Sequence, residues 1–328
     1  MKHRIGMLLV IAGMMQFQMP TADSAPTDLS KPVAVSVPAV VSKPKVAPSL
    51  SKPKGFAAIP ATFCRYVPER EDDFAWENDR VAFRVYGPAL LGQVADSGID
   101  CWPKRVEYPI INRWYAGMHK GLSYHDDHGE GCDNYHVGRS RGCGGTALWM
   151  NEQMVTAGLW TDWHVEACGR DRSTFTLIYR YPSKNGVEPV IETKTISIAI
   201  GEDWFTSTSV FTQAGKPYAG KEVVAGLTTH DGKGLATLDP EGRWVSVWED
   251  IKGLGPVGTG LALPSGARLL EIRTPKPEDS SHVIAIMKTD AEGRLKFRSG
   301  FCWTKAGRIT SPEDWQKVLA EASKGLQP

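Results

Sequence analysis

Residues 80–86 read RVAFRVY, an alternation of polar and apolar side chains that is typical of a β-strand. Successive side chains of a strand point to opposite faces, so Val81, Phe83 and Val85 would share one face. The other face would carry Arg80, Arg84 and Tyr86. Six more runs have strand character, at residues 174–181, 190–200, 204–212, 243–248, 282–287 and 295–303. Many strands and few helices predict an all-β fold, a large antiparallel β-sandwich.

One helix is predicted at the C-terminus. Ser311 can cap it, Pro312 suits the first helical position, and Asp314 completes a capping-box pattern. Apolar side chains then recur at helical spacing and form a stripe that should pack on a sheet: Trp315, Val318, Leu319 and Ala322.

The first 55 residues are predicted to lie outside the folded domain. Residues 1–25 have the pattern of a signal peptide, with a basic start, a short apolar run and small residues near a cleavage point. Residues 26–55 are rich in Pro, Ala, Ser and Lys and predict an extended linker. Residues 56–328 would form a single β-sandwich catalytic domain. The protein is therefore expected to be exported, either periplasmic or secreted, and to have no membrane span.

Composition narrows the class of partner. The net charge of +1 gives no basic footprint for nucleic acid. The 11 tryptophans among 328 residues suit a carbohydrate binder, whose rings stack on sugars, although the rings could equally belong to the core. Six cysteines agree with an oxidising compartment. A bridge between Cys132 and Cys143 and two free buried thiols are both consistent with the spacing.

Residues 124–145 read YHDDHGEGCDNYHVGRSRGCGG and hold three imidazoles, two phenols, two guanidinium groups and four carboxylates. Six glycines run through this stretch, which is therefore expected to be a loop and neither a helix nor a strand. Loops on a rigid scaffold often carry binding and catalytic groups. A solvated connection is the alternative, but such connections rarely combine so many kinds of titratable group.

Three kinds of chemistry fit this loop. His125, His128 and Asp133 could gather on a metal ion, either Zn²⁺ or Ca²⁺, although the spacing matches no zincin motif. A hydrogen-bonded histidine pair is the alternative. Glycoside hydrolysis needs two opposed carboxylates, for which Glu130 and Asp133 are candidates.

Elimination from a uronic acid requires a cation or other neutralising group at the carboxylate, a base for the C5 proton and an acid for the group that leaves C4. The loop supplies histidines, tyrosines and arginines, and this mixture favours elimination. Arg80 and Arg84 could add anion binding, since a guanidinium grips a carboxylate in two places. A salt-bridged sheet face is the equal alternative for these two arginines.

Several longer segments resemble the domain-of-unknown-function family numbered 4861. The resemblance rests on residues 68–90 (PEREDDFAWENDRVAFRVYGPAL), 97–100 (SGID), 123–131 (SYHDDHGEG), 140–145 (SRGCGG), 192–196 (ETKTI), and the pairs Trp114-Tyr115 and Trp248-Glu249. It spans nearly everything after the linker. It implies a galactose-mutarotase-like supersandwich in exported proteins of bacterial polysaccharide-utilisation systems. Some members are similar to oligosaccharide dehydratases that act on a terminal uronic acid.

The leading hypothesis is therefore a lyase or dehydratase that acts by β-elimination on uronic-acid-containing oligosaccharides or polysaccharides. The candidate catalytic residues are His125, His128, Tyr124, Tyr135 and Glu130. The candidate substrate-binding residues are Arg80, Arg84, Asp133, Arg139, Arg141 and Trp303. A glycoside hydrolase that uses Glu130 and Asp133, and a non-catalytic carbohydrate-binding protein, are the alternatives.

Overall fold

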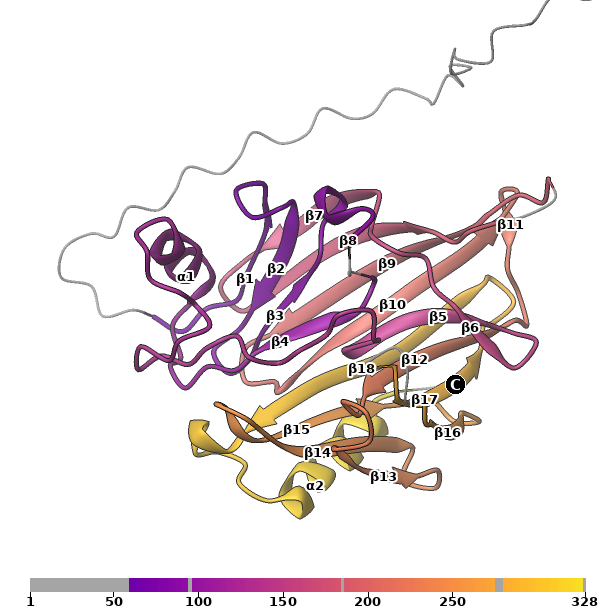
Figure 1. The fold of residues 1–328 in the computed structure, drawn as a ribbon. Helices are drawn as coiled ribbons and strands as arrows, with labels where there is room; N and C mark the ends of the chain where they lie inside the picture. The colour runs from indigo at the N-terminus through magenta and orange to yellow at the C-terminus, as the bar shows by residue number, and fades with distance from the viewer. Residues whose placement is uncertain (1–58, 94–95, 184–185, 275–279, 327–328) are drawn as a thin grey trace, which may run out of the picture. The chain divides into compact units, whose positions relative to one another are not determined.

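The computed structural model describes residues 59–93, 96–183, 186–274 and 280–326. The predicted signal peptide, residues 1–25, and the predicted linker, residues 26–55, lie outside these residues. Within them, three antiparallel sheets and two α-helices make up the fold (Figure 1). The predicted all-β antiparallel fold is thereby confirmed. No helix in the described ranges combines the length and apolar character that crossing a membrane requires.

The first sheet is built from the N-terminal part of the described chain. Its four strands lie in the order β1 (Phe63–Val67), β2 (Asp73–Glu77), β3 (Ala82–Val85) and β4 (Ile99–Trp102). The predicted strand at 80–86 is thus confirmed in its centre. Arg80 precedes β3, however, so the alternation that was expected to place Arg80 and Arg84 on one face does not extend to Arg80.

The largest sheet has nine strands in the described residues. Its order is β13 (Leu235–Asp239), β14 (Trp244–Ile251), β15 (Gly255–Ala262), β18 (Arg294–Trp303), β10 (Trp204–Gln213), β9 (Val190–Ala199), β8 (Arg172–Arg180) and β7 (Asp162–Cys168), with β11 (Lys216–Pro217) paired to β10. The third sheet has the order β16 (Arg268–Ile272), β17 (His282–Lys288), β12 (Glu222–Thr228), β5 (Cys143–Met150) and β6 (Gln153–Val155). All six further strand predictions fall on strands of these two sheets.

Aromatic side chains join the four-stranded sheet to the nine-stranded one. The Phe74 ring from β2 stacks on Phe175 from β8, with ring centroids 4.4 Å apart. Phe83 from β3 meets Phe205 and Phe301 edge-on, at 5.0 and 5.2 Å. Strands β5 and β12 of the third sheet contact the nine-stranded sheet as well, and one continuous hydrophobic core includes residues of all three sheets. This is the sandwich that the sequence predicts.

Helix α2 (Pro312–Lys324) confirms the predicted C-terminal helix and its cap. The Ser311 hydroxyl accepts a hydrogen bond from the Asp314 backbone N–H. The indole of Trp315 donates to the Thr259 carbonyl on β15. Leu261 points from β15 into the sandwich core, whereas its neighbour Ala262 packs with α2 residues, so α2 covers the outer face of the large sheet.

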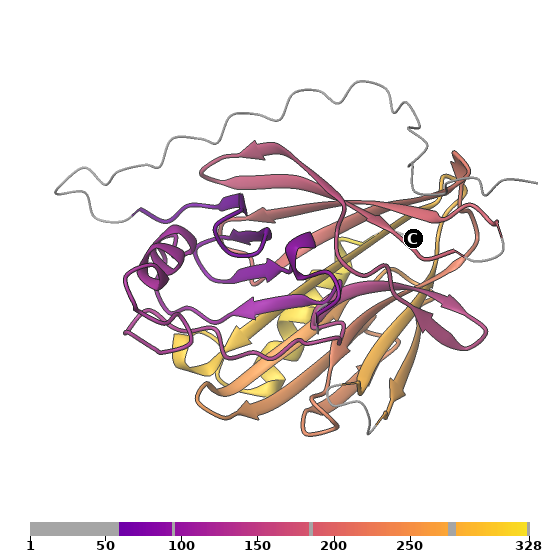
Figure 2. The same cartoon turned by 45° about the horizontal axis from the view of Figure 1, so that its top comes forward.

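Helix α1 (Ile111–Met118) is a helix that the sequence did not predict. It lies beside the N-terminal sheet and contacts β2 (Figures 1 and 2). No side chain of the helix's own N-terminus caps it. The Glu77 carboxylate at the end of β2 does so instead, because it accepts hydrogen bonds from the backbone N–H groups of Ile110 and Ile111 at 2.8–2.9 Å.

The tryptophans serve mainly the core. Eight of the 11 are buried and the other three are half-buried, so none is exposed as a free stacking surface. The half-buried ones are Trp163, Trp204 and Trp248. The abundance of this residue therefore does not identify a sugar platform.

Candidate functional site

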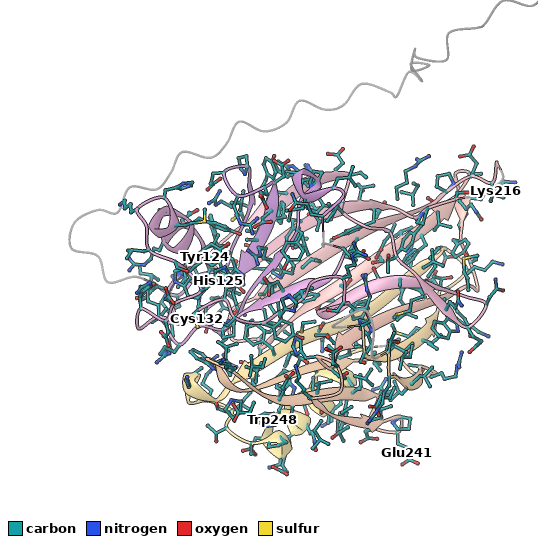
Figure 3. The ribbon with its side chains drawn as sticks, viewed as in Figure 1. Tyr124, His125, Cys132, Lys216, Glu241 and Trp248 are labelled. Atoms are coloured by element: carbon teal, nitrogen blue, oxygen red, sulfur yellow. The ribbon has the colours of Figure 1, made fainter. Side chains whose placement is uncertain are left out.

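The polar stretch at residues 124–145 runs as a loop from Tyr124 to Gly142, as predicted. Its last three residues, Cys143 to Gly145, begin β5 and correct the expectation that its glycines exclude a strand. Tyr124 and His125 lie together beside α1, whereas Trp248 lies at a distance, near α2 (Figure 3). Within the loop itself, Tyr124 lies beside α1 whereas Tyr135 packs against His230, so the loop does not aim all of its polar groups at one place.

A pocket of about 380 Å³ lies between α1 and the first half of this loop. The α1 side contributes Arg113, Trp114 and Lys120, and the loop contributes Tyr124, Asp126, His128 and Glu130. Three of the predicted catalytic residues, Tyr124, His128 and Glu130, thus line one cavity. Its size is within the usual range for small-ligand sites. We call this cavity the α1 pocket.

Glu130 lines the α1 pocket, and three hydrogen bonds hold its carboxylate in place. Its carboxylate accepts hydrogen bonds from the Tyr108 hydroxyl at 2.6 Å, the Arg113 guanidinium at 2.6 Å and the Trp114 indole N–H at 3.1 Å. Partial burial opposes ionisation, but these three donors lower the pKa of Glu130 below its ordinary value. Glu130 therefore orients Arg113 and Trp114 and is ill-suited to donate a proton at neutral pH.

Two of the three loop histidines, His125 and His128, bind backbone carbonyls. His128 Nε2 lies 3.0 Å from the Ser123 carbonyl oxygen, and His125 Nδ1 lies 2.5 Å from that of Asp133. A carbonyl only accepts, so each of these nitrogens carries the hydrogen. In the neutral rings, the lone pair is then on Nδ1 of His128 and on Nε2 of His125. Both side chains are exposed, and His128 lines the α1 pocket while His125 packs against the Tyr124 ring.

Tyr124 lines the α1 pocket, and its hydroxyl contacts a buried charge cluster. Its oxygen accepts hydrogen bonds from Arg70 Nε at 3.2 Å and from Arg84 Nη1 at 3.3 Å. Two guanidinium donors on one phenol oxygen stabilise negative charge there. Tyr124 is thus positioned by cations that do not themselves line the pocket.

Arg84 is the centre of that buried cluster, which also contains Asp73, Asp100 and Asp133. Its guanidinium lies 3.6, 2.5 and 3.0 Å from the carboxylates of these three residues. Burial outweighs the attraction of Arg84 and raises the pKa of Asp100 to about 8 and those of Asp73 and Asp133 to about 6. Arg84 and Asp133 were both predicted to bind substrate. They instead form an ion pair with each other, and both are buried.

The remaining predicted residues lie outside the α1 pocket. Arg80 pairs with Asp203 at 2.8 Å. Arg141 is buried and pairs with Asp96 at 3.1 Å. The Trp303 ring is buried beneath the Arg105 guanidinium, 4.7 Å away, so a sugar could reach that face only if Arg105 moved.

Tyr135 and Arg139 come from the second half of the loop. Tyr135 is buried and meets the His230 ring edge-on at 5.0 Å. Arg139 is exposed and does not line the α1 pocket.

The proposed metal ligands do not fit a single ion. The Asp133 carboxylate is buried and bound to Arg84, whereas both histidines are exposed. Nowhere in the described ranges do three or more His, Cys, Asp or Glu side chains form a group that could hold a metal. The histidines do not form a mutual pair either, since each has its own carbonyl partner.

The cysteines do not brace the loop. All six are free thiols in this structure. Cys143 lies against Ser299 and Gly300 in the core, whereas Cys132 lies by Asn134 in the loop. Of the two alternatives for Cys132 and Cys143, the structure shows the free thiols.

The sequence reasoning missed a second ionic group, the pair His230 and Glu249. His230 Nδ1 lies 2.5 Å from the Glu249 carboxylate, and Nε2 lies 2.6 Å from the His136 carbonyl oxygen. The imidazole is thus held between a carboxylate and a backbone carbonyl oxygen. Glu249 belongs to the Trp248-Glu249 pair of the resemblance, which was the available signal. His230 has no such signal.

Comparison with known proteins identifies the family. A family described as "Domain of unknown function (DUF4861)" matches residues 14–328. The chain belongs to the DUF4861 family. This DUF4861 protein is 35% identical over 274 residues to "Uncharacterized protein P7" of Formosa agariphila, covering 80% of this chain and 67% of that protein. The predicted family is confirmed.

Solved structures similar to this DUF4861 protein are distant in sequence. A heparan sulfate lyase, HepC from Pedobacter heparinus, matches with a TM-score of 0.39 at 9% identity, over 74% of this chain and 36% of that chain. A putative aldose 1-epimerase from Klebsiella pneumoniae matches with a TM-score of 0.35 at 8% identity, over 78% of this chain and 85% of that chain. The chain thus spans about a third of the length of the lyase.

Proposed function

We propose that this DUF4861 protein is a carbohydrate-active lyase or dehydratase, which eliminates a group from a uronic-acid-containing oligosaccharide in the α1 pocket. One observation carries the proposal: a single pocket combines Arg113 and Lys120 with the His128 imidazole and the Tyr124 phenol. These are the cation, base and acid that elimination next to a carboxylate requires.

The cations would bind the uronate carboxylate. Arg113 is held in place by Glu130, at 2.6 Å, and keeps further N–H groups for a ligand. Lys120 is exposed at the end of α1, and in the part of the chain that the structure describes no ion pair joins it to a carboxylate. Neutralising the sugar carboxylate acidifies the neighbouring C5–H bond, because it stabilises the charge that develops when the proton leaves.

His128 would remove the C5 proton through the lone pair on Nδ1. The electrons of the C5–H bond then form the C4–C5 double bond, and the C4–O bond breaks. Tyr124 would donate its proton to the departing oxygen, which leaves as water in a dehydratase or as a sugar hydroxyl in a lyase. Arg70 and Arg84 would stabilise the phenolate that remains. His128 would return its proton to Tyr124 through solvent before the next turnover.

The hydrolase alternative, with Glu130 and Asp133 as a pair, has weaker support. Glu130 lines the α1 pocket, but Asp133 is 3% exposed and bound to Arg84. The two carboxylates therefore do not face one substrate. This separation favours elimination over hydrolysis by that pair.

An assay with uronic-terminated oligosaccharides tests the proposal. We expect an ultraviolet chromophore from the conjugated uronate with the wild type, and a decrease of roughly 10²–10⁴-fold with His128→Gln. His164→Gln is the matched control, because His164 is an exposed histidine on β7 outside the α1 pocket, and it should retain full activity. Reducing sugar released without a chromophore would instead indicate the hydrolase. Binding with neither product, equal in wild type and His128→Gln, would indicate a non-catalytic carbohydrate-binding protein.

A further inference from the structure

Two cysteines face each other where the four-stranded sheet meets the nine-stranded sheet. Cys64 is in β1 and Cys168 ends β7, and each of these strands is the edge of its sheet. Cys168 Sγ lies 3.5 Å from the Cys64 backbone nitrogen and 3.6 Å from its carbonyl oxygen. Cys64 Sγ lies 3.9 Å from the carbonyl oxygen of Ala167. Each sulfur therefore contacts the opposite strand, at or next to the other cysteine.

Neighbouring hydrogen bonds hold the two strands in this alignment. The Thr62 hydroxyl donates to the Gly169 carbonyl at 2.5 Å and lies 2.8 Å from the Ser173 hydroxyl. The Thr62 backbone N–H donates to the Arg170 carbonyl at 2.8 Å. A disulfide forms only where the backbone already brings two cysteines close, and this part of the chain does so.

We propose that Cys64 and Cys168 are a reversible disulfide pair that locks the edge of the four-stranded sheet to the edge of the nine-stranded sheet. The proposal is independent of the α1 pocket and of the proposed elimination.

The environment gives the two thiols different roles. Cys168 is exposed, whereas Cys64 is 4% exposed. A hydrogen bond from the Cys64 thiol lowers the pKa of Cys168 to about 6, so its thiolate predominates at neutral pH. The same interaction, together with burial, raises the pKa of Cys64. Cys168 is thus the nucleophile that an oxidant meets first, and Cys64 is the resolving thiol.

The oxidant would be a disulfide, such as glutathione disulfide. The Cys168 thiolate attacks one of its sulfurs, which forms a mixed disulfide and releases one glutathione thiolate. Cys64 then loses its proton to solvent and attacks the Cys168 sulfur, which releases the second glutathione. Two protein thiols are oxidised to one disulfide, and one glutathione disulfide is reduced to two thiols.

Thiol mapping of the full chain tests the pair. The reduced protein is equilibrated in glutathione buffers of increasing oxidised fraction, quenched in acid, alkylated under denaturing conditions and digested. We expect a cross-linked peptide that joins Cys64 to Cys168. Cys132 and the buried Cys143 should remain reduced and therefore be recovered in alkylated form. In Cys64→Ser, glutathione should remain attached at Cys168 because the resolving thiol is gone. Cys132→Ser is the matched control and should form the Cys64–Cys168 link unchanged.

Thermal unfolding gives a second readout. Cys64 and Cys168 lie 104 positions apart, so the bond closes a long loop of the unfolded chain. Oxidation should raise the Tm of the wild type and of Cys132→Ser by roughly 5–10 °C and leave that of Cys168→Ser unchanged. The proposal is overturned if Cys64 and Cys168 are both alkylated at the most oxidising ratio, or if the link joins Cys132 to Cys143.

Discussion

Arg84 shows how one residue organises the area behind the α1 pocket. One guanidinium lies within 3.6 Å of three buried carboxylates, so the cluster cannot keep all of its charges without a large desolvation cost. The raised pKa values are the result, with that of Asp100 highest at about 8. A protonated Asp100 relieves the excess negative charge and leaves Arg84 oriented toward Tyr124.

This cluster predicts a pH-dependent stability. Between the ordinary aspartate pKa of about 4 and the raised pKa of about 8 in the folded state, the folded protein binds more protons at Asp100 than the unfolded chain does. The contribution of Asp100 is therefore fully present at low pH and is lost as the pH rises through about 8. Asp73 and Asp133 act in the same direction at lower pH, through their raised pKa values of about 6.

Asp100→Asn tests this origin, since an amide mimics the protonated carboxyl and cannot ionise. We expect urea unfolding to show similar stability for wild type and variant near pH 4, and a variant that becomes progressively more stable than the wild type as the pH rises to about 8. Asp250→Asn, at an exposed position, should follow the wild-type pH profile. Parallel profiles for wild type and Asp100→Asn would contradict the assignment.

At the scale of elements, the two helices differ in where their caps come from. The cap of α2 is local, since Ser311 lies directly before the helix. The cap of α1 is Glu77, more than 30 positions earlier, which the buried Lys104 also contacts at 2.8 Å. The local cap could be read from the sequence. The distant one could not, because no nearby residue signals that α1 begins at Ile111.

Removal of the two caps should therefore lower the free energy of unfolding by different amounts. We expect Ser311→Ala to lower the free energy of unfolding by about 1 kcal/mol, since it removes one exposed hydrogen bond. Glu77→Gln should lower it by about 3–5 kcal/mol, because it leaves the Lys104 ammonium buried without its counter-charge. Ser311→Thr keeps the cap and is the control. Urea unfolding measures all three, and equal losses for the two caps would contradict this view.

At the scale of the whole molecule, a close approach at Gly142 joins the two smaller sheets. Ile99 at the start of β4 and Gly142 just before β5 form a parallel bridge. Gly142 has φ of +55°, and a β-carbon there would lie 2.1 Å from the Ile99 carbonyl oxygen. This junction connects the sheet that positions α1 to the sheet that follows the polar loop.

Gly142→Ala should therefore destabilise the whole domain. We expect a loss of about 3 kcal/mol or more, from the strained φ and the clash with the Ile99 backbone. Gly158→Ala is the matched control, because Gly158 also has a positive φ, +75°, but open space around it, and about 1 kcal/mol should be lost. Denaturant midpoints give both values. A loss at Gly142 no larger than at Gly158 would show that the junction tolerates a side chain.

The sequence by itself determined the all-β class, seven of the strands, helix α2, the loop character of residues 124–142 and the family. Each of these depends on local patterns, namely alternation, caps, glycines and contiguous motifs, which persist whatever the rest of the chain does. Only the tertiary structure decided which loop residues share the α1 pocket, that Arg84 and Asp133 neutralise one another, and that Glu77 caps α1. These outcomes depend on contacts between residues 30 to 50 positions apart. They also depend on burial, which shifts the pKa of a side chain and removes it from contact with solvent and ligands.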